Sequence, residues 1–210
     1  MTSRRARHPL VTALAWSALT VAAATQLQGC VLLLGGAAVG GGALVVSDRR
    51  TSGTQLEDQA IELKSGGRIR EAIGDRGHVN VTSYSRIALI TGEVPSAEDK
   101  EAVGKAIAAI DNVANVVNEL EVGPNSTLGT RSSDTLITTR VKAALIDAKD
   151  IQAHAIKVVT ERGNVYLMGR VTEREASRAA DIARSQASVM KVVRVFDILT
   201  EEQLANLRDD

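Results

Sequence analysis

An internal repeat is the feature that most constrains how this chain can fold. Residues 90–94 (Ile-Thr-Gly-Glu-Val) match residues 167–171 (Leu-Met-Gly-Arg-Val), and the offset from 90 to 167 is 77. Two shorter matches flank this one: 79–81 with 156–158 at an offset of 77, and 113–117 with 189–193 at an offset of 76. Because self-similarity at a fixed spacing indicates repeated structural units, we predict two copies of one small fold.

Each copy shows the same order of predicted elements. An amphipathic helix comes first, and a second helix, opened by a side-chain cap, lies between the second and third strands. The predicted strands are 79–83, 87–91 and 116–122 in the first copy, and 156–160, 165–168 and 192–199 in the second. In the second copy Arg162 and Gly163 suit a hairpin turn, and Thr172 with Glu175 forms a capping box. The predicted class is α+β, with two tandem α-β-β-α-β domains and the helices packed on a small mixed sheet.

The domain boundaries follow from the repeat. We place the first copy at 57–123, a linker containing Pro124 at 124–131, the second copy at 132–199 and a polar tail at 200–210. Copies of this size form only small hydrophobic cores, so packing between them is expected to add stability. The tail indicates no function.

The N-terminal segment indicates export. Three arginines precede an apolar run at 10–27, and the only cysteine, Cys30, follows at the end of the tetrapeptide Leu-Gln-Gly-Cys. This order is typical of a signal peptide and resembles the bacterial lipobox, whose cysteine is lipidated. We predict that 1–29 is a lipoprotein signal peptide and that Cys30 carries a covalent N-terminal lipid, including palmitate, with no other cofactor. The alternative is a transmembrane helix at 10–27, which is just long enough.

Residues 30–56 separate the signal from the first copy. After Cys30, residues 31–46 are all apolar or glycine. The run is short for a membrane span, and its glycines disfavour a helix. We expect it to lie at or near the membrane and to be followed by a polar linker.

Composition and motifs argue against several functions. The chain has 25 basic and 25 acidic residues, and loss of three arginines with the signal leaves a formal charge of −3, so a basic nucleic-acid surface is not expected. Nucleophile elbows, paired-carboxylate signatures and zinc-protease motifs are absent, which predicts a protein that is not an enzyme. His78 and His154 each precede a predicted strand. No cysteine or second histidine lies at ligand spacing, so a repeated structural role is preferred and no metal site is expected.

The repeated pattern resembles a known family. A hydrophobic-x-Gly-x-Val segment around Gly92 and Gly169 is followed by a capped alanine-rich helix and a Val-x-x-Val-x-Asn strand at 113–118. This arrangement resembles the BON domain, and the whole mature chain is similar to outer-membrane lipoproteins that carry two such domains. The resemblance implies a periplasmic, lipid-anchored protein of the outer membrane. It also implies binding of anionic phospholipid and upkeep of envelope integrity.

The resemblance further implies which helix meets lipid. In the family, lipid contact is made by the first helix of the second domain, through a Trp and an apolar residue ten positions later. Those positions are Leu136 and Ile146 here, so the Trp, which favours the membrane interface, is absent. The predicted lipid-binding residues are Leu136, Thr139, Arg140, Lys142, Ala143 and Ile146.

The residues themselves allow two interpretations of this helix. At about 100° per residue, Ile137, Val141 and Leu145 share a core face, whereas Leu136 and Ile146 fall away from it. The two aliphatic side chains then either contact lipid, with Arg140 and Lys142 near phosphate headgroups, or pack against the first copy. Three nearby acidic residues weaken the local positive field: Asp134, Asp147 and Asp150. A second hypothesis is an adaptor that docks an outer-membrane assembly or cell-division protein on this surface or on a strand edge.

Overall fold

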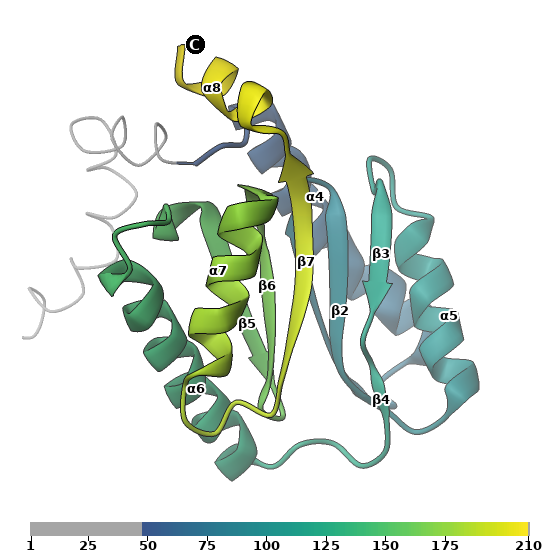
Figure 1. The fold of residues 1–210 in the computed structure, drawn as a ribbon. Helices are drawn as coiled ribbons and strands as arrows, with labels where there is room; N and C mark the ends of the chain where they lie inside the picture. The colour runs from purple at the N-terminus through teal and green to yellow at the C-terminus, as the bar shows by residue number, and fades with distance from the viewer. Residues whose placement is uncertain (1–47, 210) are drawn as a thin grey trace, which may run out of the picture. The chain divides into compact units, whose positions relative to one another are not determined.

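The computed structural model describes residues 48–209, and the side chains of residues 48–207 (Figure 1). The predicted signal peptide, Cys30 and the glycine-rich segment lie outside the described residues. Within the described part, residues 48–209 belong to one compact unit that contains both repeats.

The first repeat is a four-stranded sheet with two helices. Its elements are α4 (Ser52–Ile73), β1 (His78–Tyr84), β2 (Ile87–Val94), α5 (Ala97–Ala108), β3 (Asn115–Asn118) and β4 (Glu121–Val122). Strand β1 pairs with β2 in antiparallel fashion, and β3 and β4 both pair with β2 in parallel. The predicted last strand is therefore interrupted between β3 and β4.

The second repeat has the same order with an uninterrupted last strand. Its elements are α6 (Leu128–Asp147), the short 3₁₀ helix η2 (Ala153–Ala155), β5 (Ile156–Glu161), β6 (Asn164–Thr172), α7 (Glu173–Arg184) and β7 (Lys191–Leu199). Strand β6 is central, antiparallel to β5 and parallel to β7 (Figure 1). The two mixed sheets with their helices confirm the predicted α+β class.

Helices extend into segments where the sequence indicated linker or tail. Helix α4 begins at Ser52, because Thr51 accepts a hydrogen bond from the Thr54 N–H as its N-cap. Thr127 caps α6 in the same way, so α6 begins inside the segment 124–131. The final helix α8 (Glu201–Asp209) follows β7 and buries Leu204.

The two hairpins share a turn and a carboxylate that holds it. Both turn residues have positive φ in each hairpin, Ser85 and Arg86 in the first, Arg162 and Gly163 in the second, as a type I′ turn requires. The carboxylate of Asp134 on α6 accepts the N–H groups of Arg162 and Gly163, at 2.9 and 2.8 Å. Asp58 on α4, 76 residues earlier, accepts those of the first turn, at 2.8 and 2.7 Å. A buried aspartate thus fixes each hairpin to the preceding helix.

The motif glycines allow close strand pairing. Gly92 lies opposite Val79 within the β1–β2 ladder, and Gly169 lies opposite Ile156. A Cβ at Gly92 would collide with the carbonyl oxygen of His78, and Gly92 also has a φ of 113°. A glycine is therefore required by the approach of the partner strand, rather than by a turn towards the following helix.

Among residues 48–207, three hydrophobic clusters form the core. One lies under α4 and α5 and another under α6 and α7. In β2, Ala88 and Ile90 join the first of these, while Leu89 points to the other face of the sheet and joins Tyr166 and Met168 of β6 in a third cluster. Because side chains alternate along a strand, the nearly continuous apolar runs of β2 and β6 fill both faces. The two sheets therefore pack on each other through their helix-free faces, which supplies the expected contribution from packing between the copies.

Candidate functional site

Helix α6 carries an exposed apolar stripe opposite its core face. Ile137, Val141 and Leu145 are at most 2% exposed, as the helical spacing predicts. On the opposite side Leu136 is 57% exposed and Ile146 is 63% exposed. The two side chains therefore do not pack against the first repeat, and that alternative is wrong. Thr139 and Ala143 lie between them on the same face and are also exposed.

Two cations border this stripe. At about 100° per residue, Arg140 lies on one side of it and Lys142 on the other, and both are exposed. Within residues 48–207 neither forms an ion pair, although Arg140 donates a 3.3 Å hydrogen bond to the carbonyl of Ala187. The face thus combines apolar side chains with two cations that no carboxylate neutralises by contact.

Two of the three acidic residues near this face are engaged elsewhere. The Asp134 carboxylate is buried under the hairpin turn, where it accepts two backbone N–H groups. Asp150 pairs with Arg178 at 2.8 Å. The carboxylates of Asp134 and Asp147 form no ion pair within residues 48–207, so both still oppose the positive charge. The ion pair of Asp150 therefore removes only part of the weakening that the sequence indicates.

The equivalent surface of α4 has a different character. The offset of 76 between Asp58 and Asp134 aligns Leu136 with Ala60, Ile146 with Arg70 and Arg140 with Lys64. The positions of Leu136 and Ile146 therefore hold no large aliphatic residue in the first repeat. Leu56 and Leu63, which are 68% and 84% exposed, lie seven residues apart on that face of α4 at other positions.

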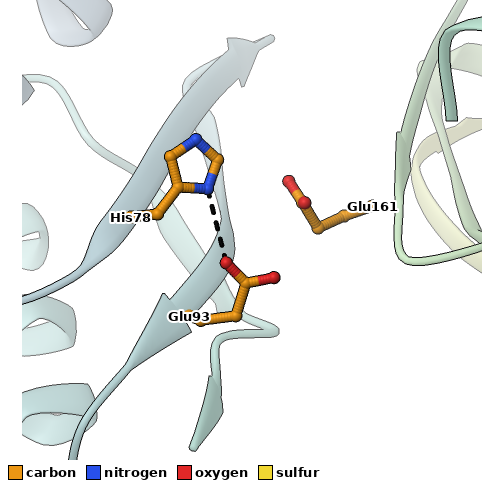
Figure 2. Close-up of side chains that lie close together, drawn as sticks. All are labelled: His78, Glu93 and Glu161. Atoms are coloured by element: carbon orange, nitrogen blue, oxygen red, sulfur yellow. Dashed lines mark ion pairs between the residues drawn. The ribbon is translucent and has the colours of Figure 1, made fainter. Parts of the chain in front are cut away.

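A second group of ionisable side chains lies where the repeats meet. His78 of β1 and Glu93 of β2 are direct partners in the hairpin ladder, and Glu161 at the end of β5 faces them (Figure 2). One ligand atom from each lies within 4.8 Å of the others. Burial raises the pKa of Glu161, and the negative charge of Glu93 raises it further. Sequence reasoning treated His78 as structural and did not select either glutamate.

Part of that group was accessible from the sequence. A two-residue turn at Ser85 and Arg86 fixes the register that places Glu93 opposite His78. Glu161 belongs to the other repeat. No sequence pattern predicts that the two sheets pack so that the end of β5 lies beside His78 and Glu93.

The family of this protein is shown by matches in both repeats. Residues 58–124 and 133–200 each match the BON domain, so the chain belongs to the BON-domain family and carries two copies.

Comparison with three similar proteins narrows the class within the family. The chain is 36% identical over 187 residues to the outer membrane lipoprotein DolP of Haemophilus influenzae, which covers 87% of this chain and 95% of the relative. It is 30% identical over 152 residues to a 21 kDa hemolysin of Actinobacillus pleuropneumoniae, covering 71% and 78%. It is also 26% identical over 159 residues to the osmotically-inducible protein Y of Escherichia coli, covering 72% and 77%. The chain is therefore a dual-BON lipoprotein similar to DolP, located at the outer membrane and facing the periplasm.

The helices of residues 48–209 do not themselves provide a membrane span. None of them combines the length and apolar character needed to cross a bilayer.

Proposed function

We propose that the second BON domain binds anionic phospholipid through α6 and thereby helps to maintain outer-membrane integrity, by binding rather than catalysis. The observation that carries this proposal is the exposed stripe of Leu136 and Ile146 with Arg140 and Lys142 on its two sides. Apolar side chains flanked by cations are the pattern of a surface that lies in the headgroup region of a bilayer. The lipid expected on Cys30 tethers the domain to the membrane that it contacts.

The energetics favour a weak contact that the tether makes effective. Each cation near an anionic surface contributes on the order of 1 kcal/mol. Partial burial of two aliphatic side chains adds about 1–3 kcal/mol in total. Such a contact is weak in free solution, but tethering raises the local concentration of membrane around the domain.

The test uses the fragment 47–210, which contains the compact unit and lacks the predicted anchor. We expect it to co-sediment with vesicles that mix phosphatidylglycerol and phosphatidylcholine, and much less with phosphatidylcholine alone. Leu136→Ser combined with Ile146→Ser is expected to weaken binding at least about tenfold, because both apolar contacts are lost. Leu63→Ser on α4 is the control, since it removes an even more exposed leucine from the first repeat.

Charge reversal separates lipid from protein recognition. Arg140→Glu is expected to weaken binding to anionic vesicles about fivefold or more, whereas Lys64→Glu at the equivalent position of α4 has little effect. Vesicle binding that is unchanged in Arg140→Glu and in the double serine variant contradicts lipid recognition by α6. Loss of envelope integrity in cells that carry the same folded variants would then point to a protein partner on this surface.

A further inference from the structure

The cluster of His78, Glu93 and Glu161 contains buried ligand atoms that no hydrogen bond satisfies. Among residues 48–207, only three buried side-chain nitrogen or oxygen atoms lack a hydrogen bond, and two of them are His78 Nδ1 and Glu93 Oε1. The Glu93 side chain is fully buried. Buried polar atoms of this kind are uncommon, because their loss of hydration is not compensated. Both atoms belong to one cluster, into which the Glu93 carboxylate points (Figure 2).

The protein supplies little positive charge to this cluster. Arg162 Nε lies 3.3 Å from Glu93 Oε1, without the alignment of a hydrogen bond, and the same guanidinium pairs with Glu121 at 3.0 Å. One arginine therefore serves two carboxylates, and Glu161 has no ion pair among the described residues. Glu161 is buried beside the carboxylate of Glu93, so its charge is poorly balanced by the protein. A bound cation would balance the excess of negative charge.

The spacing suits a metal ion of small radius. His78 Nδ1 lies 3.4 Å from Glu93 Oε2. Two ligands at Zn²⁺ bond lengths of about 2.1 Å, separated by the tetrahedral angle, lie about 3.4 Å apart. All three ligand atoms fall within 4.8 Å, so a modest rotation of the Glu161 side chain completes a three-ligand site.

The carboxylates have the outer support that metal ligands usually have. The Ser126 N–H donates to Glu93 Oε2 at 3.0 Å, and Asn80 Nδ2 lies 3.5 Å from Glu161 Oε2. Such hydrogen bonds orient ligating carboxylates. His78 and Glu161 also line a cavity of about 430 Å³ beside α6, which gives an ion and its remaining water ligand a route from solvent.

We propose that His78, Glu93 and Glu161 form a Zn²⁺ site that joins the two BON domains. One imidazole nitrogen with two carboxylate oxygens matches the ligand preferences of Zn²⁺, whereas Mg²⁺ and Ca²⁺ prefer oxygen ligands alone. The site takes two ligands from the first repeat and one from the second, so metal binding stabilises their packed arrangement. This proposal does not depend on lipid binding and departs from the sequence-based expectation of no metal site.

The experiment is calorimetric titration of ZnCl₂ into the full-length chain in detergent. The protein carries no polyhistidine tag and has Cys30→Ser, so that no thiol or added histidine takes the metal. We expect saturable binding of one Zn²⁺ per chain. His78→Gln and Glu161→Gln are each expected to weaken binding at least about tenfold, and His154→Gln, an exposed histidine of the second repeat, keeps it.

A spectroscopic readout and a second variant keep the test decisive. Co²⁺ in place of Zn²⁺ is expected to give the intense visible absorption of a tetrahedral site, and His78→Gln abolishes it. Glu93→Gln is expected to lose Zn²⁺ binding as well, but its side chain is fully buried, so the two other ligand variants decide if it does not fold. The absence of one-to-one binding overturns the proposal. Binding that survives in both His78→Gln and Glu161→Gln, or that His154→Gln abolishes, does the same.

Discussion

In the first repeat the N-terminus of α5 is held by Arg76, whose side chain is 63% exposed, whereas in the second repeat that of α7 is held by Arg49, which is 5% exposed. Each arginine pairs with the acidic residue three positions after the cap, Asp99 in α5 and Glu175 in α7. Arg49 precedes the first repeat in sequence yet also donates to the carbonyl of Arg170 and to the Gln152 side chain. The ion pair at the helix cap is thus largely exposed in the first repeat. In the second repeat it is buried and links two distant segments of the chain.

The two hairpins also differ in how charges are paired at the end of their first strand. At Tyr84, Arg50 lies 4.0 Å from the ring centre and pairs with Asp48 and Asp58, so the carboxylates there have a guanidinium partner. At Glu161, which occupies the same place 77 residues later, the single Arg162 faces several carboxylates. The repeated fold fixes the backbone positions. The side chains at those positions decide whether the carboxylates between the repeats have a cationic partner or are open to a ligand.

The largest expected effect comes from the two caps. Replacing Arg49 with alanine is expected to reduce the free energy of unfolding by about 3–5 kcal/mol, because the buried Glu175 carboxylate loses its partner. Arg76→Ala, its counterpart in the first repeat, is expected to cost about 1 kcal/mol or less. Urea denaturation of the 47–210 fragment measures both. Equal costs would show that burial of the arginine does not distinguish the repeats.

The two turn-holding aspartates provide a finer comparison. Asp134→Ala is expected to cost about 2 kcal/mol, because two backbone N–H groups lose their acceptor. Asp58→Ala is expected to cost at least about 1 kcal/mol more, since Asp58 also accepts from Ser83 Oγ and pairs with Arg50. The same denaturation measurement ranks them. The reverse order would mean that the partners of Asp58 contribute nothing net.

The smallest effect is a pH dependence with opposite signs at two buried glutamates. Burial and the charge of Glu93 raise the pKa of Glu161, so its favourable contribution is present below the unfolded pKa and lost as pH rises through the folded value. Burial alone would raise the pKa of Glu175, but the bonds from Arg49 and Thr172 lower it overall. Its contribution is therefore present at neutral pH and lost on acidification.

Glu161→Gln separates these signs. In EDTA, the variant is expected to be more stable than the natural chain at pH 7 by less than about 1 kcal/mol, with the difference vanishing near pH 4. Glu101→Gln, at an exposed glutamate of α5, is the control and changes little at either pH. A destabilised Glu161→Gln at pH 7 would contradict the assignment of Glu161 as a buried, poorly balanced charge.

The sequence predicts the repeated elements well because they depend on local patterns. The apolar runs of β2 and β6, the capping box at Thr172 and the turn at Gly163 are each specified within a few residues. Burial of the core face of α6 follows from its helical spacing in the same way. Elements, turns and buried helix faces that depend only on neighbouring residues can therefore be predicted from the sequence alone.

Long-range partners cannot be predicted in this way. Arg49 lies in a segment predicted to be linker, yet its partner lies 126 residues away. Glu161 follows the end of a predicted strand, and only the packing of the two sheets brings it to His78. The first turn of α6 lies inside the segment 124–131, which was predicted to be a linker. The polar residues there suggest a loop, but one of them, Thr127, is the N-cap of the helix.

The most direct test of lipid recognition by α6 uses a single tryptophan. The chain has one Trp, at position 16, so the 47–210 fragment has none. Leu136→Trp places the only Trp of the fragment on the stripe, and Leu63→Trp places it at an exposed site of α4. With phosphatidylglycerol vesicles, we expect the emission of Leu136→Trp to shift to the blue, because the indole enters the membrane interface, while that of Leu63→Trp stays constant. An unchanged spectrum for Leu136→Trp, or equal shifts at the two sites, contradicts the account.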